Sequence, residues 1–83
     1  MSPFDLFVGN EASRKLIELP ADDQPHALAA FQTVAEHPFT TGLPRWVGPD
    51  GRTRYLRAVR GWLITFRIDH AERSVRILDL DRS

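Results

Sequence analysis

The chain has 83 residues and no cysteine, and its 11 basic and 11 acidic side chains give a formal net charge of zero. A chain this short is expected to form one domain, residues 1–83, with a small core and without disulfides or thiolate metal sites. No apolar stretch approaches the roughly 20 residues that span a bilayer, and no leader-like segment begins the chain, which predicts a cytoplasmic protein with no membrane partner.

The charge is distributed unevenly along the chain. Residues 1–44 hold two basic and six acidic side chains, whereas residues 45–83 hold nine arginines and five acidic residues. Arginine presents planar donors that match phosphate and carboxylate groups. The second half therefore predicts either a surface that binds anionic groups or a sheet face that is only solvated, and composition leaves both open.

The first 20 residues predict a strand and a helix. Residues 4–8 alternate between apolar and polar positions, with Phe4, Leu6 and Val8 on one side, as in a short strand. Asn10 is the expected N-cap of a helix over residues 11–19. The apolar stripe of this helix consists of Ala12, Leu16 and Leu19.

A second helix is expected from Asp22 or Asp23 to about Glu36, with Pro25 tolerated in its first turn. The short linker between the helices predicts an antiparallel hairpin. Residues 39–52 are rich in glycine and proline and are expected to be mostly loop. The apolar stripe of the second helix consists of Ala27, Phe31, Val34 and Ala35. In the loop, Leu43 and Trp46 are expected to pack on the core.

Residues 54–80 carry three consecutive strand signals. In the middle one Trp62, Ile64, Phe66 and Ile68 alternate with Leu63, Thr65 and Arg67, which predicts a strand with one buried face. The dipeptide Arg60-Gly61 before it favours a tight hairpin turn. The polar residues 69–73 predict a second turn before a third strand, so this region is expected to be a three-stranded antiparallel meander.

The order of these elements resembles the RelE/ParE superfamily of toxins from bacterial type II toxin–antitoxin modules. Residues 57–69, RAVRGWLITFRID, are similar to the family's strand pair, and residues 75–80 are similar to its closing strand. The resemblance covers nearly the whole chain. It implies an α+β fold in which an N-terminal strand and a two-helix hairpin pack on a C-terminal three-stranded antiparallel meander.

The resemblance also implies a growth-inhibiting toxin without a cofactor, and a cognate antitoxin that covers the arginine-bearing sheet surface. In nuclease members an arginine follows the aromatic residue of the third strand, where this chain has Leu63. The only tyrosine is Tyr55, the sequence ends at Ser83, and the net charge is low for a protein that enters the ribosome. These departures favour a ParE-like protein target such as DNA gyrase.

Two alternatives remain open at this point: a metal-independent endoribonuclease that cleaves mRNA on the ribosome, and an inactive interaction module. For the nuclease, alternation on the strands and the arginine content point to a cationic patch that stabilises the charged transition state. The candidate catalytic residues are Arg57, Arg67 and Arg82, and the candidate nucleic-acid-binding or partner-binding residues are Arg54, Arg57, Arg60, Arg67 and Arg76.

The histidines and the aspartates near the end of the sequence give weaker indications of function than the arginines. His26, His37 and His70 have neither the sequence spacing nor the neighbouring carboxylates that a metal site requires, so no metal is expected. Asp79 and Asp81 would point to one side of a strand and are expected to pair with Arg76 or Arg82. An outer strand of the meander is expected to remain open for strand addition by a partner.

Overall fold

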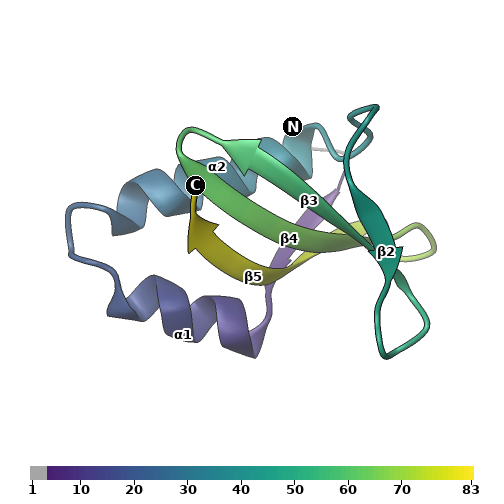
Figure 1. Cartoon of the computed structure of the whole chain (residues 1–83), viewed down its shortest axis with the longest axis horizontal. Coiled ribbons are helices and arrows are strands. Elements are labelled where there is room, and N and C mark those ends of the chain that lie inside the picture. The colour runs from purple at the N-terminus through teal and green to yellow at the C-terminus, as the bar shows by residue number, and fades with distance from the viewer. Residues whose placement is uncertain (1–3) are drawn as a thin grey trace.

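The computed structural model describes residues 4–83 and shows an α+β domain with two helices and one sheet (Figure 1). In chain order its elements are β1 (Asp5–Val8), α1 (Asn10–Glu18), α2 (Gln24–Glu36), β2 (Arg45–Val47), β3 (Thr53–Val59), β4 (Trp62–Asp69) and β5 (Ser74–Arg82). The predicted fold class, the two helices and the meander β3–β4–β5 are confirmed. None of the helices in this part of the chain is both long and apolar enough to cross a bilayer.

The sheet has five strands in the order β1-β5-β4-β3-β2, and β1 joins β5 in parallel while all other pairs are antiparallel. The strand β2 was not expected, because residues 39–52 read as loop. The turn at Pro49 to Gly51 reverses the chain, and the Gly48 amide donates to the Arg52 carbonyl at 2.9 Å. This reversal places Arg45–Val47 beside the start of β3, where a short ladder forms.

Both helices contribute to one core against the sheet. α1 packs along β5, and α2 packs across β1, β4 and β5, running opposite to α1 in Figure 1. The predicted stripe of α2 and the predicted face of β4 are buried, except for the half-buried Ile68. Residues with no exposed surface include Ala27, Phe31, Val34, Ile64, Phe66, Val75 and Ile77.

Two local expectations were wrong. Gly9, not Asn10, is the N-cap of α1, because Gly9 is tied to β5 by a 2.8 Å hydrogen bond from its amide to the Ile77 carbonyl. Trp46 does not pack on the core: it lies on β2 and is 43% exposed. Leu43, by contrast, does pack against the core as expected.

The β3–β4 hairpin turns through Arg60 and Gly61, whose φ angles are +52° and +86°. Two consecutive positive φ values are typical of the type I′ turn, whose twist matches that of the two strands. The predicted tight hairpin is therefore confirmed.

The expectation of a long free outer strand in the meander was wrong. The start of β5 is paired with β1, the rest of β5 is flanked by α1, and the start of β3 is paired with β2. The outer edges of the sheet belong to the short strands β1 and β2. Strand addition to the meander itself is consequently blocked over much of its length.

Candidate functional site

The face of the sheet opposite the core is formed by residues from all five strands, and we call it the open face. Directly paired residues in a sheet share a face, so the pairs Leu56–Thr65 and Ala58–Leu63 place these four side chains opposite the buried Ile64 and Phe66. The open face comprises Asp5, Phe7, Trp46, Arg54, Leu56, Ala58, Leu63, Thr65, Arg67, Asp69, Ser74, Arg76, Asp79 and Asp81.

A β-bulge decides which residues of β5 reach this face. Phe66 pairs with Ile77 but Thr65 pairs with Asp79, so Leu78 is the extra residue. The side-chain alternation shifts by one beyond this point. As a result Leu80 enters the core, where it is 3% exposed, and Asp79 lies on the open face.

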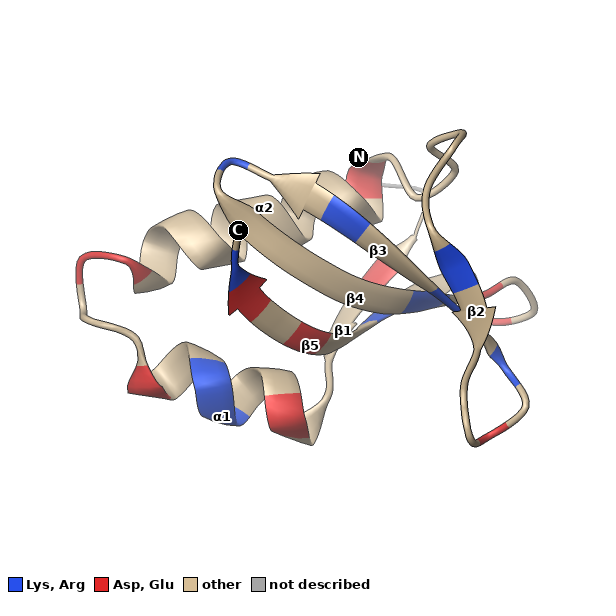
Figure 2. Cartoon of the chain, viewed as in Figure 1, with Lys and Arg blue, Asp and Glu red and all other residues tan. Residues whose placement is uncertain are grey.

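One end of the open face carries three arginines on three neighbouring strands, which we call the arginine row: Arg54, Arg67 and Arg76. Arg67 and Arg76 are direct cross-strand partners on β4 and β5. Arg54 and Arg67 are the next residues after the paired Tyr55 and Phe66. Figure 2 shows the basic band of β4 at this end of the sheet, close to the start of β3. The basic band of β2 in the same picture is Arg45, which pairs with Tyr55 and therefore belongs to the opposite face.

An aromatic residue flanks the row on each side. Trp46 is the cross-strand partner of Arg54, and Phe7 is the partner of Arg76. The Arg76 guanidinium carbon lies 5.9 Å from the centre of the Phe7 ring. Sequence reasoning missed both aromatic residues, although pairing across the turn at Pro49 to Gly51 could have indicated Trp46.

Within residues 4–83 no member of the arginine row forms an ion pair. Two carboxylates near the row, Asp50 in the β2–β3 turn and Asp69 at the end of β4, have lowered pKa values. Each is lowered mainly by a backbone amide that donates to the carboxylate, from Arg52 to Asp50 at 3.1 Å and from Glu72 to Asp69 at 3.0 Å, with a smaller contribution from the charge of Arg67. The row is therefore only partly neutralised by the protein itself.

Arg54 is held in place by the β2–β3 turn. Its Nε atom is buried without a hydrogen-bond partner, and a side chain at Gly48 would collide with its guanidinium group. The turn thus covers the base of this guanidinium group. Glycine at position 48 is what allows this close approach.

The centre of the open face is apolar. Leu56, Ala58 and Leu63 lie there with Thr65, and all but Ala58 are half-buried. None of these four side chains can donate a proton, accept one as a general base at neutral pH or neutralise a developing charge. The centre can bind an apolar surface, but it does not contain the groups that phosphodiester cleavage needs.

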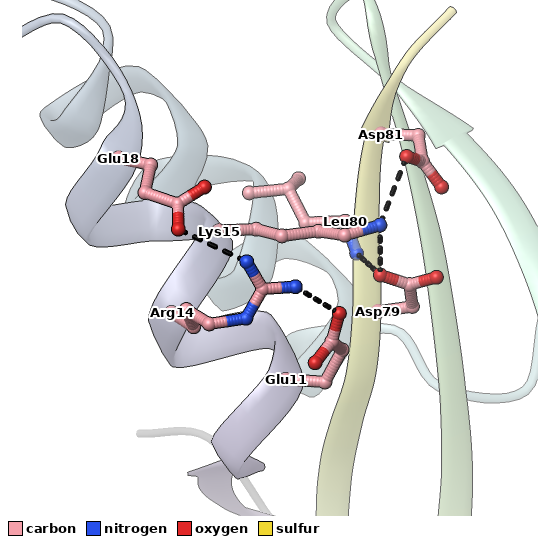
Figure 3. A network of polar contacts seen from close by, with 7 residues as sticks. All are labelled: Glu11, Arg14, Lys15, Glu18, Asp79, Leu80 and Asp81. Carbon is pink, nitrogen blue, oxygen red and sulfur yellow. Dashed lines mark hydrogen bonds and ion pairs between the residues drawn. The ribbon is translucent and has the colours of Figure 1, made fainter.

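The far end of the open face is acidic, and it is linked to α1 (Figure 3). Lys15 Nζ lies 2.8 Å from Asp79 Oδ1 and 3.2 Å from Asp81 Oδ1. The Lys15 ammonium group donates hydrogen bonds to the carboxylates of Asp79 and Asp81, and these bonds raise the pKa of Lys15. The expected pairing of these carboxylates with Arg76 or Arg82 was wrong, because α1 flanks β5 where β1 ends.

Two of the predicted catalytic arginines lie on the other face. Arg57 pairs with the buried Ile64, and Arg82 pairs with the buried Trp62, so both point toward the helices. Arg82 forms an ion pair with Asp23. Arg57 and Arg82 therefore lie on the helix side of the sheet and Arg67 on the open face, so the three candidate catalytic arginines do not form one cationic patch.

The remaining predicted residues are scattered. Arg60 lies in the β3–β4 turn, at the end of those strands opposite the arginine row. His70 stacks on Phe39 with ring centres 5.6 Å apart. No group of three or more histidine, aspartate or glutamate residues suited to a metal occurs among the described residues.

Two adjoining hollows occupy the helix side of the sheet, beyond the end of α2. They have volumes of about 520 and 320 Å³ and share Tyr55 and Ile68 as lining residues. The ring of Tyr55 also stacks on Phe66, with centres 5.5 Å apart. Tyr55 is therefore separated by the sheet from the arginine row.

These features define a small α+β domain whose exposed sheet face carries the arginine row at one end, apolar side chains at its centre and the Lys15-linked carboxylates of Asp79 and Asp81 at the other end. No protein-family model matches the sequence, and its comparison with curated proteins finds no match. Solved structures do match the fold, and among them are RelE toxins, alone or in complex.

The toxin–antitoxin complex RelBE2 from Mycobacterium tuberculosis contains a chain that matches with a TM-score of 0.78 and 23% identity, over 100% of this chain and 94% of that one. The isolated E. coli RelE toxin matches with a TM-score of 0.72 and 15% identity, over 96% of this chain and 84% of that one. The RelE–RelB complex from Pyrococcus horikoshii OT3 matches with a TM-score of 0.70 and 12% identity, over 96% and 94% respectively. The chain therefore has the RelE fold.

Proposed function

We propose that this protein is the toxin of a type II toxin–antitoxin pair and that a cognate antitoxin covers its open face. The observation that carries the proposal is the RelE fold, matched over the whole chain by a toxin–antitoxin complex. The exposed sheet face supports it, because an apolar centre beside unpaired arginines is a surface suited to a protein partner.

For the cellular target we propose a protein, such as DNA gyrase, bound in the manner of ParE. Leu63, Leu56 and Ala58 fill the centre of the open face and supply no acid, base or cation. A toxin that acts by binding needs complementary surface, whereas one that cleaves RNA needs stabilisation of a charged transition state. The open face offers more of the surface needed for binding than of the charged groups needed to stabilise that transition state.

Ribosome-dependent mRNA cleavage is the second candidate, and the arginine row is the feature that favours it. Arg54, Arg67 and Arg76 could contact a phosphate backbone. Arg57 and Arg82 would have to act from the opposite face, where they already bind His37 and Asp23. This candidate therefore rests on fewer of the arginines than the sequence suggested.

The test is induced expression in a bacterial host, followed by three assays on the same cells or extracts: growth, mRNA 5′-end mapping with and without ribosomes, and gyrase supercoiling. Arrested growth, intact mRNA and loss of supercoiling are expected. New mRNA ends that require ribosomes would replace the gyrase proposal with the nuclease. Normal growth would leave the inactive interaction module.

A gain-of-function variant sharpens the comparison. Leu63→Arg introduces a cation at the centre of the open face, next to Thr65 and Ala58, without touching the core. If the protein acts only by binding, this variant is expected to weaken toxicity and to leave mRNA intact. Ribosome-dependent cleavage by the variant alone would indicate a nuclease scaffold that has lost its central cation.

A further inference from the structure

The two hollows beyond the end of α2 lie on a part of the sheet that the helices leave open. α1 packs along β5, and α2 packs across β1, β4 and β5 before it ends at Glu36. In Figure 1 β2 and the start of β3 lie to the right of both helices. The helix side of these strands is bordered instead by residues 38–43, which line the larger hollow together with Arg45, Tyr55 and Ile68.

Aromatic rings border both hollows. The ring of Tyr55, which lines both, stacks on the buried Phe66 with centres 5.5 Å apart. Phe39 lines the larger hollow, is 60% exposed, and stacks on His70 of the smaller hollow with centres 5.6 Å apart. An edge-on contact with Phe4, at 5.3 Å between ring centres, also supports Phe39. The hollows are therefore bordered by ring surfaces that a planar ligand can contact.

The charged side chains of the hollows leave an excess of positive charge. They are Arg45 in the larger hollow and Arg52, Asp69 and His70 in the smaller one. The Asp69 carboxylate accepts a hydrogen bond from the Glu72 amide at 3.0 Å and lies 3.7 Å from Arg52. Among residues 4–83 no carboxylate lies within ion-pair distance of Arg45. Arg45 is thus a cation without a counter-charge at the border of an aromatic hollow.

Arg45 and Tyr55 can contact the same small molecule. They are direct cross-strand partners on β2 and β3, so their side chains share a face and their Cβ atoms are about 5 Å apart. The volumes of the two hollows, about 520 and 320 Å³, both lie in the range of roughly 300–1,000 Å³ that is typical of small-molecule sites. The planar guanidinium group of arginine matches carboxylate and phosphate groups.

We propose that the two hollows form a binding site for a small aromatic anion, a planar ring system that carries one carboxylate or phosphate group. The ring system lies against Tyr55 and Phe39, and the anionic group accepts hydrogen bonds from Arg45. This site is on the opposite side of the sheet from the open face. The inference therefore goes beyond the proposed toxin function and does not depend on it.

The experiment is a titration of the isotope-labelled full chain with naphthyl phosphate and, separately, with naphthoate, followed through the backbone amide signals in NMR spectra. Naphthalenemethanol and inorganic phosphate are the controls, because the first lacks the anionic group and the second lacks the ring. Saturable binding of one or both anions is expected, with shifted signals at Gly42, Tyr55 and Ile68. Both controls should bind about tenfold or more weakly.

The two anions share one ring system, so the tighter of them identifies the preferred anionic group. Absence of saturable binding by either anion would overturn the proposal. Inorganic phosphate that binds as tightly as naphthyl phosphate would also overturn it, because the ring would then contribute nothing.

Two variants with the same change in charge locate the site. Arg45→Gln removes the proposed anion contact and should fold, because Arg45 is exposed and forms no ion pair among residues 4–83. Arg67→Gln removes one cation from the arginine row on the open face. The tighter anion is expected to bind Arg45→Gln about tenfold or more weakly and Arg67→Gln within about twofold of the wild type. Equal losses, or a larger loss in Arg67→Gln, would overturn the inference.

Phe39→Leu tests the contact with the ring. Leucine keeps an apolar side chain at this exposed position but removes the flat aromatic surface. The tighter anion is expected to bind this variant about threefold or more weakly, whereas inorganic phosphate should bind it as it binds the wild type. Unchanged binding of the aromatic anion would contradict the proposed position of its ring.

Discussion

Arg57 donates a hydrogen bond at 2.9 Å to the main-chain carbonyl of His37, the residue that follows the end of α2. The carbonyls at a helix C-terminus lack partners within the helix and carry partial negative charge, so a guanidinium group there both satisfies and neutralises them. Arg57 thus joins β3 to the end of α2. Arg57, which the sequence suggested as a catalytic residue, therefore has a structural role.

Replacing Arg57 with alanine is therefore expected to lower the free energy of unfolding by about 1 kcal/mol. Urea unfolding followed by circular dichroism would measure it. Arg45→Ala, on the exposed strand β2, is the matched control and should change stability by less than about 0.5 kcal/mol. Equal stabilities of the two variants would show that the contact with His37 contributes nothing.

The assignment of the core is tested by replacing isoleucine with valine at one buried and one exposed position. Ile77 has no exposed surface in β5, whereas Ile17 of α1 is 74% exposed. Ile77→Val is expected to cost about 1 kcal/mol through lost packing, and Ile17→Val should cost only a few tenths. Thermal or urea unfolding of both variants checks this, and a larger loss at Ile17 would contradict the assigned core.

The β3–β4 turn offers a stabilising substitution. Arg60 has a φ of +52°, a conformation that asparagine tolerates better than arginine does, and Gly61 follows it with a φ of +86°. Arg60→Asn is expected to raise the unfolding free energy by about 0.5 kcal/mol. Gly61→Ala, which forces a Cβ into the left-handed region, should lower it by about 1 kcal/mol. A destabilised Arg60→Asn variant would argue against this turn.

Asp69 links stability to pH. Its pKa is lowered mainly because the Glu72 amide donates to its carboxylate at 3.0 Å, with a further contribution from the charge of Arg52. A lowered folded-state pKa means that the carboxylate stabilises the fold above its unfolded pKa of about 3.9, and that this advantage is lost as pH falls through the folded value.

Wild type and Asp69→Asn should accordingly differ in stability at pH 7 and converge as the pH falls below about 4. Urea unfolding of both proteins at several pH values from 7 to 2.5 would measure the difference in their free energies of unfolding. The other carboxyl groups titrate in both proteins, so their contributions cancel in this difference. Asp22→Asn, in the exposed α1–α2 linker, provides the control. A difference between wild type and Asp69→Asn that stays constant with pH would contradict the prediction.

The candidate site was predictable only in part. The alternation in β4 correctly separated Arg67 from the buried Trp62, Ile64 and Phe66, because one face of that strand is uniformly apolar. In β3 both faces mix apolar residues with arginine, so the sequence did not indicate that Arg57 faces the helices. The row itself depends on the register between strands, which local periodicity does not encode.

What the sequence by itself determined is the set of elements: two amphipathic helices, a tight hairpin and a strand with one buried face, each specified by side-chain periodicity and turn residues over a few neighbouring positions. The tertiary structure alone decided that β1 lies parallel beside β5, that a bulge at Leu78 turns Asp79 toward the open face, and that α1 brings Lys15 to it. The pairing of Asp5 with Ser74 joins residues 69 positions apart and the ion pair of Lys15 with Asp79 joins residues 64 positions apart. All three outcomes depend on how the elements pack to bury one common core.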